Sequence, residues 1–237
     1  CELISELLKT KNTAYILDGE GILGLEAACA SLTESGDKVL VVDNGIYGKG
    51  FADFVTMYGG QVTFYESTYT QAVDVKEFRA FLEEHHDFKY ATLVHCDTPS
   101  GVLNPVEELS RALHEYGIMT IVDSVSAMMG EPLRVDEGQI DIVCGGSQKA
   151  VSAPPGLTFV TVSDAAMKAM EERKTPIASF YANILVFKDY YKNLWFPYTM
   201  PISDIYGLRT ALENVKADPD RYERHKKYGE RTGRPVQ

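Results

Sequence analysis

The strongest constraint on the fold is a repeated alternation of short apolar runs with longer amphipathic stretches. The runs are rich in β-branched residues, and they are TAYIL (13–17), KVLVV (38–42), QVTFY (61–65), ATLVHC (91–96), IMTIVD (118–123), IDIVC (140–144) and LTFVTV (157–162). Each run is continuously apolar rather than alternating, which predicts a strand covered on both faces. Amphipathic stretches that predict helices lie between many of them, at 22–34, 74–86 and 105–117. This order predicts an α/β fold, a three-layer αβα sandwich around a roughly seven-stranded, mostly parallel sheet.

The last two runs, 140–144 and 157–162, follow one another without a helical pattern between them. A parallel connection usually contains a helix, whereas an antiparallel one does not need it. One member of this pair is therefore expected to run antiparallel, which makes the sheet mixed.

Composition excludes several classes of partner. The 237 residues carry a formal net charge of −11, so the chain lacks the basic footprint that nucleic acid or an anionic membrane requires. No apolar run is long enough to cross a membrane. The four cysteines show no metal-ligand spacing, and Cys29, Cys96 and Cys144 lie in apolar runs as buried free thiols. We therefore expect no metal site and a reducing, cytoplasmic location.

The segments that follow the predicted strands are unusually polar and rich in glycine. They are DGEG (18–21), DNGIYG (43–48), DTPSG (97–101), DSVSA (123–127) and GGSQK (145–149). Ligands of open α/β sheets bind beyond the carboxyl ends of the strands. These five loops are therefore the expected site.

The first of these loops, extended as DGEGILGLEAA (18–28), leads into a predicted helix. It suits a phosphate held by free amide groups around Gly19, Glu20 and Gly21 at the helix start, or only a tight strand-to-helix turn. The carboxylates of Asp18 and Glu20 weigh against a phosphate unless the backbone binds it and these side chains turn away.

Lys149 lies in GGSQKAVSAPPG (145–156), a turn of small residues and prolines between two predicted strands. Three interpretations are open: an exposed loop lysine, a phosphate ligand, or a Schiff-base nucleophile whose pKa is lowered by burial and nearby positive groups. The glycines and prolines predict a rigid, closely packed turn. An exposed lysine would not require such a turn.

Three other residues have both a structural and a functional interpretation. Asp123 is a turn cap, or a buried carboxylate that keeps a heterocyclic nitrogen protonated. Tyr47 packs in the ordinary way or stacks on a planar cofactor, and His95 is interpreted as a satisfied core residue. An anion-binding helix start, a ring, an aspartate and a lysine together make the set that pyridoxal 5'-phosphate needs.

The segment VDSVSAMMGEPLRVDEGQIDIVCGGSQKAVSAPPGLTFVTVS (122–163) closely resembles the lysine region of class V aminotransferases of the alanine–glyoxylate and serine–pyruvate type. DTPSGVLNPV (97–106), DNGIYGKG (43–50) and GEGILGLEAA (19–28) match that family in order and spacing. The likeness runs from about residue 13 to about residue 215.

The resemblance implies the large domain of a PLP-dependent transferase of fold type I that works as a homodimer. It implies that Lys149 forms the Schiff base and shuttles the proton, and that Asp123 pairs with the pyridine nitrogen. The other implied cofactor contacts are Glu20, Gly21 and Ile22 in the glycine loop, Tyr47 on the ring, Thr98 at the phenolic oxygen, Val125 under the ring, Gln148 at the phosphate, and Thr199 of FPYTMP (196–201), which would reach the phosphate of the other subunit.

Two departures from the family pattern affect these expectations. Glu20 stands where serine is common, and Ile22 and Leu23 replace polar residues, which leaves the phosphate to backbone amides and Gln148. We also expect residues 1–200 to form the PLP-binding large domain and 201–237 to begin the connection to a small domain, absent here, that carries the arginine for the substrate carboxylate.

The expected reaction is a ping-pong transamination from a small amino acid, alanine or serine, to a small 2-oxo acid, glyoxylate or pyruvate. One alternative is a 2-aminoethylphosphonate–pyruvate transaminase or another class V PLP enzyme. Desulfurases usually stack a histidine on the ring and have His-Lys at the lysine, unlike Tyr47 and Gln148-Lys149. The alternative from another class is a non-catalytic remnant or dimerisation scaffold.

Overall fold

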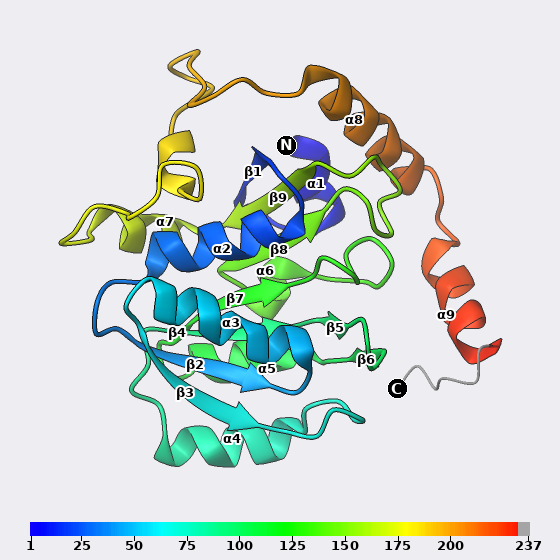
Figure 1. The fold of residues 1–237 in the computed structure, drawn as a ribbon. Coiled ribbons are helices and arrows are strands. Elements are labelled where there is room, and N and C mark those ends of the chain that lie inside the picture. Colours follow the sequence, from blue (N-terminus) through cyan, green and yellow to red (C-terminus); the bar gives the residue numbers. More distant parts are fainter. Residues whose placement is uncertain (232–237) are drawn as a thin grey trace.

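A seven-stranded sheet forms the centre of the computed structural model, which describes residues 1–231 (Figure 1). Its strands are β1 (Thr13–Asp18), β2 (Lys38–Asp43), β3 (Gln61–Glu66), β4 (Tyr90–Val94), β7 (Met119–Asp123), β8 (Ile142–Gly146) and β9 (Leu157–Val162). Their order across the sheet is β1-β9-β8-β7-β4-β2-β3. A separate ribbon pairs β5 (Cys96–Asp97) with β6 (Val102–Leu103). The predicted fold class and all seven strands are confirmed.

The mixed character of the sheet comes from β9 alone. It runs antiparallel to β8, with Cys144 opposite Val160, and also antiparallel to β1, with Thr13 opposite Val162. All other pairs in this sheet are parallel. The carboxyl ends of β1, β2, β4, β7 and β8 therefore lie along one edge of the sheet. The antiparallel pairing of β8 with β9 is the one predicted for the last two runs.

Helices cover both faces of the sheet (Figure 1). The helices are α1 (Glu2–Leu7), α2 (Gly21–Leu32), α3 (Ile46–Met57), α4 (Val75–Glu84), α5 (Val106–His114), α6 (Val135–Gly138), α7 (Asp164–Glu171), α8 (Ile202–Lys216) and α9 (Arg221–Arg231), with a 3₁₀ turn η1 (Ile184–Phe187). One apolar cluster joins the sheet to α2, α3, α7 and η1, and another joins it to α1, α4, α5 and α8. The two clusters lie on opposite faces of the sheet, so that helices, sheet and helices form the three layers of the predicted sandwich.

Strand β2 shows why its sequence is continuously apolar. Val39 and Val41 belong to one cluster, whereas Leu40 and Val42 belong to the other. Successive side chains of a strand point to opposite faces, so a strand between two helix layers needs apolar residues at every position.

Strand β3 does not follow the prediction of burial on both faces. It is the edge strand of the sheet, and its residues are exposed or half-buried. Tyr65 packs edge-on against Phe78 and Phe81 of α4, with ring centroids 4.9 and 5.1 Å apart. The apolar run of a strand does not indicate whether the strand has neighbours on one side or on both sides. The edge position of β3 could therefore not be predicted from its sequence.

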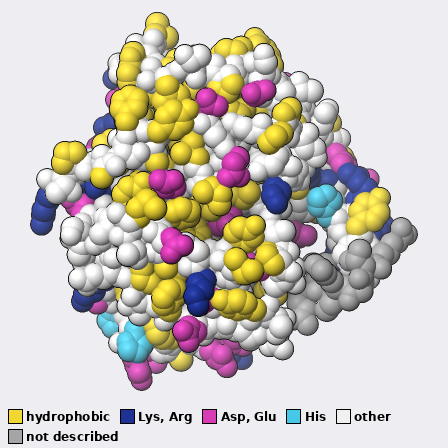
Figure 2. Space-filling view, viewed as in Figure 1, with side chains coloured by type: hydrophobic (Ala, Val, Ile, Leu, Met, Phe, Trp, Pro, Cys, Tyr) yellow, Lys and Arg dark blue, Asp and Glu magenta, His cyan; other side chains and the backbone are white. Residues whose placement is uncertain are grey.

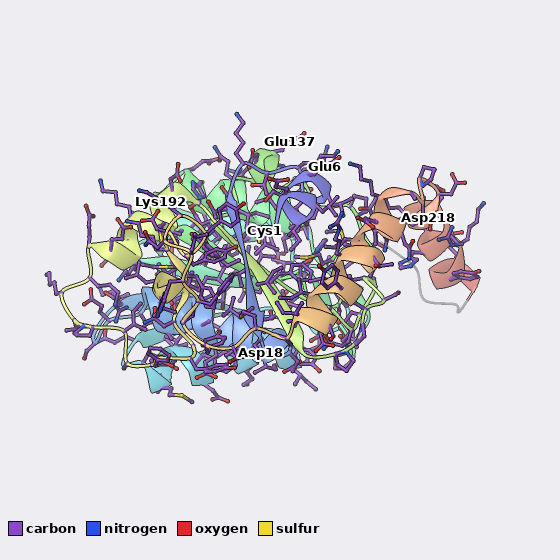
Figure 3. All side chains as sticks on the ribbon, turned by 90° about the horizontal axis from the view of Figure 1, so that it is seen from above. Cys1, Glu6, Asp18, Glu137, Lys192 and Asp218 are labelled. Atoms are coloured by element: carbon purple, nitrogen blue, oxygen red, sulfur yellow. The ribbon has the colours of Figure 1, made fainter. Side chains whose placement is uncertain are left out.

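The last two described helices lie along the margin of the molecule (Figures 1 and 3). Leu208 and Leu212 of α8 join the same apolar cluster as α1 and α5. Lys216 of α8 forms an ion pair of 2.7 Å with Glu6 of α1. The predicted domain boundary at residue 200 stays a prediction.

Within the described residues no helix is both long and apolar enough to cross a membrane. Cys29 and Cys144 are buried free thiols, as expected, and Cys96 is half-buried. The predicted cytoplasmic location stays a prediction.

Candidate functional site

The loops at the carboxyl edge of the sheet line a cavity of about 190 Å³. Its lining residues are Glu20, Gly21, Ile22, Leu25, Tyr47, Cys96, Thr98, Asp123, Val125, Ser126, Gln148 and Lys149. Every predicted site residue except Thr199 is in this set. Residues from five separate loops therefore meet, because β1, β2, β4, β7 and β8 run in the same direction and end at one edge of the sheet.

Lys149 is presented by a compact turn between β8 and β9. The hydroxyl of Ser147 donates to the Pro154 carbonyl over 2.6 Å, and the Ser152 amide donates to the Lys149 carbonyl over 2.9 Å. A Cβ added at Gly145 would lie 2.4 Å from Met128 Sδ, so only glycine fits the strand end before the turn. The turn is close-packed as predicted, but the Lys149 side chain is exposed to solvent and lines the cavity. The chain by itself does not bury this amine, and the role of Lys149 as a Schiff-base nucleophile stays a prediction.

Asp123 ends β7 and is the most deeply buried acid of the cavity, with 6% of its surface exposed. Its Oδ1 accepts a hydrogen bond of 2.9 Å from the Val125 amide. Burial raises the pKa of Asp123 to about 6; the Val125 hydrogen bond and the charge of Lys149 oppose this rise, and the charges of Asp97 and Glu20 add to it. The aspartate thus caps the turn and is also buried, and its pairing with a heterocyclic nitrogen stays a prediction. Its raised pKa means that its charge is undercompensated by the protein.

His95 lies behind Asp123 and belongs to the core, as predicted. It is 4% exposed, and its Nδ1 shares a hydrogen bond of 2.9 Å with Ser124 Oγ. Burial lowers the pKa of His95 to about 4, so the ring is neutral at physiological pH. A neutral histidine here supports the loop that carries Asp123 without adding a charge to the cavity.

Tyr47 and Val125 supply the flat and apolar surfaces of the cavity. Tyr47 is in the first turn of α3, where its amide donates to Asp97 Oδ1 over 3.3 Å, and its side chain is 40% exposed. Val125 packs closely against α2, because a Cβ added at Gly21 would lie 2.7 Å from Val125 Cγ2. Thr98 forms a hydrogen bond with Ser126. These contacts fix a side of the cavity that suits a planar ring.

The start of α2 differs from the predicted phosphate cradle. Glu20 is the N-cap residue, and its Oε1 accepts a hydrogen bond of 3.1 Å from the Ile22 amide. The Gln148 Nε2 is directed at Glu20 Oε2, 3.4 Å away. The side chain of Glu20 has therefore not turned away, and it holds two donors that the sequence assigned to phosphate.

Thr199 lies outside the cavity and is exposed. In its segment, Tyr198 stacks on Tyr181 at a centroid distance of 4.2 Å, and the Tyr181 hydroxyl donates to Asp18 Oδ2 over 3.3 Å. The role implied for Thr199 belongs to a second subunit, so it stays a prediction.

Three lining residues were not predicted: Leu25, Cys96 and Ser126. Leu25 follows Ile22 by one helical turn, and Ser126 is within the DSVSA loop, so spacing and position could have indicated both. Cys96 was assigned to the core because its run is apolar. Burial raises the pKa of its thiol to about 11, so it lines the cavity as a neutral group.

Comparison with known proteins places this architecture among aminotransferases. The solved structure of alanine–glyoxylate aminotransferase from Nostoc sp. superposes with a TM-score of 0.92 at 28% identity, covering 97% of this chain and 62% of that one. The chain belongs to the family described as aminotransferase class-V, whose sequence profile matches residues 4–231. The predicted resemblance to this family is confirmed.

Two relatives illustrate the range of the family. Pyridoxamine–pyruvate transaminase from Mesorhizobium japonicum is 36% identical over 211 residues, which cover 87% of this chain and 53% of the relative. Alanine–glyoxylate aminotransferase from Callithrix jacchus is 33% identical over 220 residues, which cover 89% of this chain and 52% of the relative. The chain thus spans about half the length of these relatives.

Proposed function

We propose that this chain carries the coenzyme-binding part of an aminotransferase that moves an amino group between a small amino compound and a small 2-oxo acid. The observation that carries the proposal is the meeting of Lys149 and the buried Asp123 in one cavity. A lysine amine attacks carbonyl compounds, and a buried carboxylate stabilises a protonated ring nitrogen.

The cavity fits a pyridoxal ring. The carboxylate of Asp123 has a raised pKa because burial is not offset by a strong cationic partner, and a ring N–H⁺ would be such a partner. Tyr47 and Val125 offer surfaces for the ring, and Thr98 offers a hydroxyl. The phosphate end of PLP, the predicted cofactor, meets Glu20 instead of a set of free donors.

When bound, a pyridoxal ring supplies an electron sink for the carbon that bears the amino group. The Asp123 carboxylate would hold the proton on the ring nitrogen, and burial keeps water from competing for that position. The Lys149 amine would take a proton from the substrate carbon on one side of the transfer and return it on the other. Because Lys149 is exposed and on a turn, its side chain has the freedom to reach both positions.

The names of relatives support a small 2-oxo acid as the acceptor, because they pair glyoxylate with alanine or with L-aspartate, and pyruvate with pyridoxamine. Alanine or serine remains the predicted amino acid donor. A phosphonate substrate needs several cations, yet Lys149 is the only basic residue among those that line the cavity, so no observation favours 2-aminoethylphosphonate. An intact lysine–aspartate cavity also argues against a non-catalytic scaffold.

A panel of half-reactions tests the proposed function. Protein loaded with a pyridoxal compound should change its absorbance spectrum on mixing with alanine, serine or aspartate, and pyruvate or glyoxylate should reverse the change. 2-Aminoethylphosphonate should leave the spectrum unaltered. A response to 2-aminoethylphosphonate alone would move the protein to the phosphonate class, and no response to any amino compound would contradict the proposal.

We also propose that two copies of the protein pair across the cavity face. Figure 2, which looks onto the layer of α2 and α3, shows hydrophobic side chains gathered on that face of the molecule. Exposed apolar residues of the surface around α2, α3 and the segment before α8 include Ile22, Ile46, Tyr47, Phe180 and Tyr181. A contiguous exposed apolar surface of this kind is typical of an interface.

Sedimentation equilibrium checks the dimer. The wild-type protein should sediment as a dimer. The double variant Ile46→Asp, Phe180→Asp should sediment as a monomer, because each substitution would bury a charge in the interface. Met57→Asp is the matched control, since Met57 is equally exposed at the opposite end of α3. A wild-type monomer, or a control that dissociates equally, would contradict the proposed interface.

A further inference from the structure

Glu20 gives the cavity an acidic end. Its carboxylate caps α2 by accepting from the Ile22 amide, and it draws the amide nitrogen of Gln148 toward it. The field of this charge also reaches Asp123, where it contributes to the raised pKa. The N-terminus of a helix carries a partial positive charge that attracts a phosphate in other proteins. At α2 the carboxylate of Glu20 already neutralises this charge.

The other charged residues that line the cavity do not neutralise the Glu20 carboxylate. Glu20 and Asp123 are acidic, and Lys149 is the single basic residue among the lining residues. A phosphate monoester brings a further charge of about −1.5 to −2 at pH 7. Lys149 is needed at the carbonyl end of the ring, so a phosphate would lie beside Glu20 without a cation of its own.

Gln148 provides an independent sign of what this end accepts. Its Oε1 is buried and has no hydrogen-bond partner among the described residues. Turning the amide over would direct the oxygen at the Glu20 carboxylate, so the observed orientation is the favourable one. The Glu20 carboxylate and Gln148 Oε1 are thus both acceptors at this end, and a phosphate dianion offers only acceptors, whereas a hydroxyl group offers one donor, for which the charged Glu20 carboxylate is the stronger acceptor.

We propose that this cavity selects the phosphate-free forms of vitamin B6, with Glu20 as the specificity-determining residue. The hydroxymethyl group of pyridoxal or pyridoxamine would donate to the Glu20 carboxylate, where PLP would place its phosphate. The inference rests on the proposed function, since it assumes that the ring binds between Lys149 and Asp123.

The consequence is that the vitamin is a substrate that enters and leaves. Pyridoxamine and a 2-oxo acid react to pyridoxal and the corresponding amino acid. The amine carbon of pyridoxamine loses its amino group and two electrons and becomes an aldehyde. The keto carbon of the oxo acid gains both and becomes an amine carbon, and the oxygen passes the other way through water, so no further oxidant or reductant is needed.

Trapping at Lys149 measures the selectivity directly. The purified protein is titrated with pyridoxal or with PLP, reduced with borohydride and digested, and the mass of the Lys149 peptide shows which aldehyde it carries. Wild-type protein should reach half-saturation at a pyridoxal concentration at least roughly tenfold below that for PLP. Glu20 is exposed and can rotate, so a preference rather than complete exclusion is expected.

Two substitutions at position 20 separate charge from shape. Glu20→Ser removes the carboxylate and keeps a cap, so it should move the ratio toward PLP by roughly tenfold or more. Glu20→Gln keeps the length and removes the charge, and it should give an intermediate ratio. Asp53→Asn is the matched control, because Asp53 is an exposed acid on the neighbouring helix α3 and lies outside the cavity.

The possible results have distinct meanings. Wild-type protein that takes PLP as readily as pyridoxal would overturn the inference and leave the proposed function standing. A ratio unchanged in Glu20→Ser would remove Glu20 as the determinant. Failure of both aldehydes to label Lys149 would contradict the proposed function itself.

Discussion

Lys149→Ala should lower the transamination rate by at least about a thousandfold while leaving the fold intact. The substitution removes both the amine that attacks the carbonyl and the group that moves the proton, and general acid–base catalysis alone contributes about 10² to 10⁴ in rate. Because the side chain is exposed and makes no side-chain hydrogen bond in the turn, little stability is at stake. Steady-state kinetics with alanine and glyoxylate, together with the thermal unfolding midpoint, measure both expectations.

Lys76→Ala is the matched control for Lys149, since Lys76 is also exposed but lies on α4 and is not among the lining residues of the cavity. It should keep the wild-type rate. A Lys149→Ala protein that retained more than about a tenth of the rate would contradict the assigned role, because none of the other lining residues in the described part of the chain is basic.

Asp123→Asn should stabilise the ligand-free protein above pH 6 and at the same time remove most of its activity. The pKa of Asp123 is raised from 3.8 to about 6 in the folded state, so the folded protein binds this proton more tightly than the unfolded chain does. Stability is therefore lost as pH rises from about 4 through about 6, by about 3 kcal/mol at the upper limit. Asparagine carries no charge at any of these pH values, and its Oδ1 still accepts from the Val125 amide.

Denaturant unfolding at pH 4 and pH 8 measures this effect. The free energy of unfolding of Asp123→Asn should exceed that of wild type by about 2–3 kcal/mol at pH 8 and match it near pH 4. The rate should fall by about a hundredfold or more, because an amide cannot hold the proton on the ring nitrogen. Equal stabilities at pH 8 would show that the Asp123 charge is compensated in the folded protein.

Asp141→Asn provides the contrast. Asp141 is also buried at 2% exposure, but its carboxylate accepts hydrogen bonds from the Thr120 amide and the Ser163 hydroxyl and pairs with His114. Removing its charge should give no stabilisation at pH 8. A gain there as large as for Asp123→Asn would mean that the effect comes from net charge and not from the cavity.

The sequence was sufficient for the sheet and for the gathering of the site, because both follow from periodicity. Seven apolar runs became seven strands, and the polar residues after them met because parallel strands end at one edge. The predicted run 140–144 became a strand at 142–146, since Asp141 is bound to Thr120 and Ser163 and not to the sheet ladder.

Other features depend on contacts that no local pattern records. The edge position of β3 follows from which strands it pairs with, and the exposure of Lys149 follows from the space beside its turn. Glu20 was identified as an unusual residue from its position, but only the structure shows its carboxylate bound to Ile22 and Gln148. The role of Thr199 depends on another subunit, which one chain cannot show.

The antiparallel strand β9 has a consequence for how the protein folds. Among the described residues, β1 pairs only with β9, so Thr13 gains a hydrogen-bonded neighbour in the sheet only after Val162 has been synthesised. Pairings so distant in sequence form late, because a long loop must close first. During synthesis, β1 and the Glu20 loop therefore stay unpaired until the turn that carries Lys149 has left the ribosome. The two ends of the cavity, which carry Glu20 and Lys149, therefore come together late in synthesis.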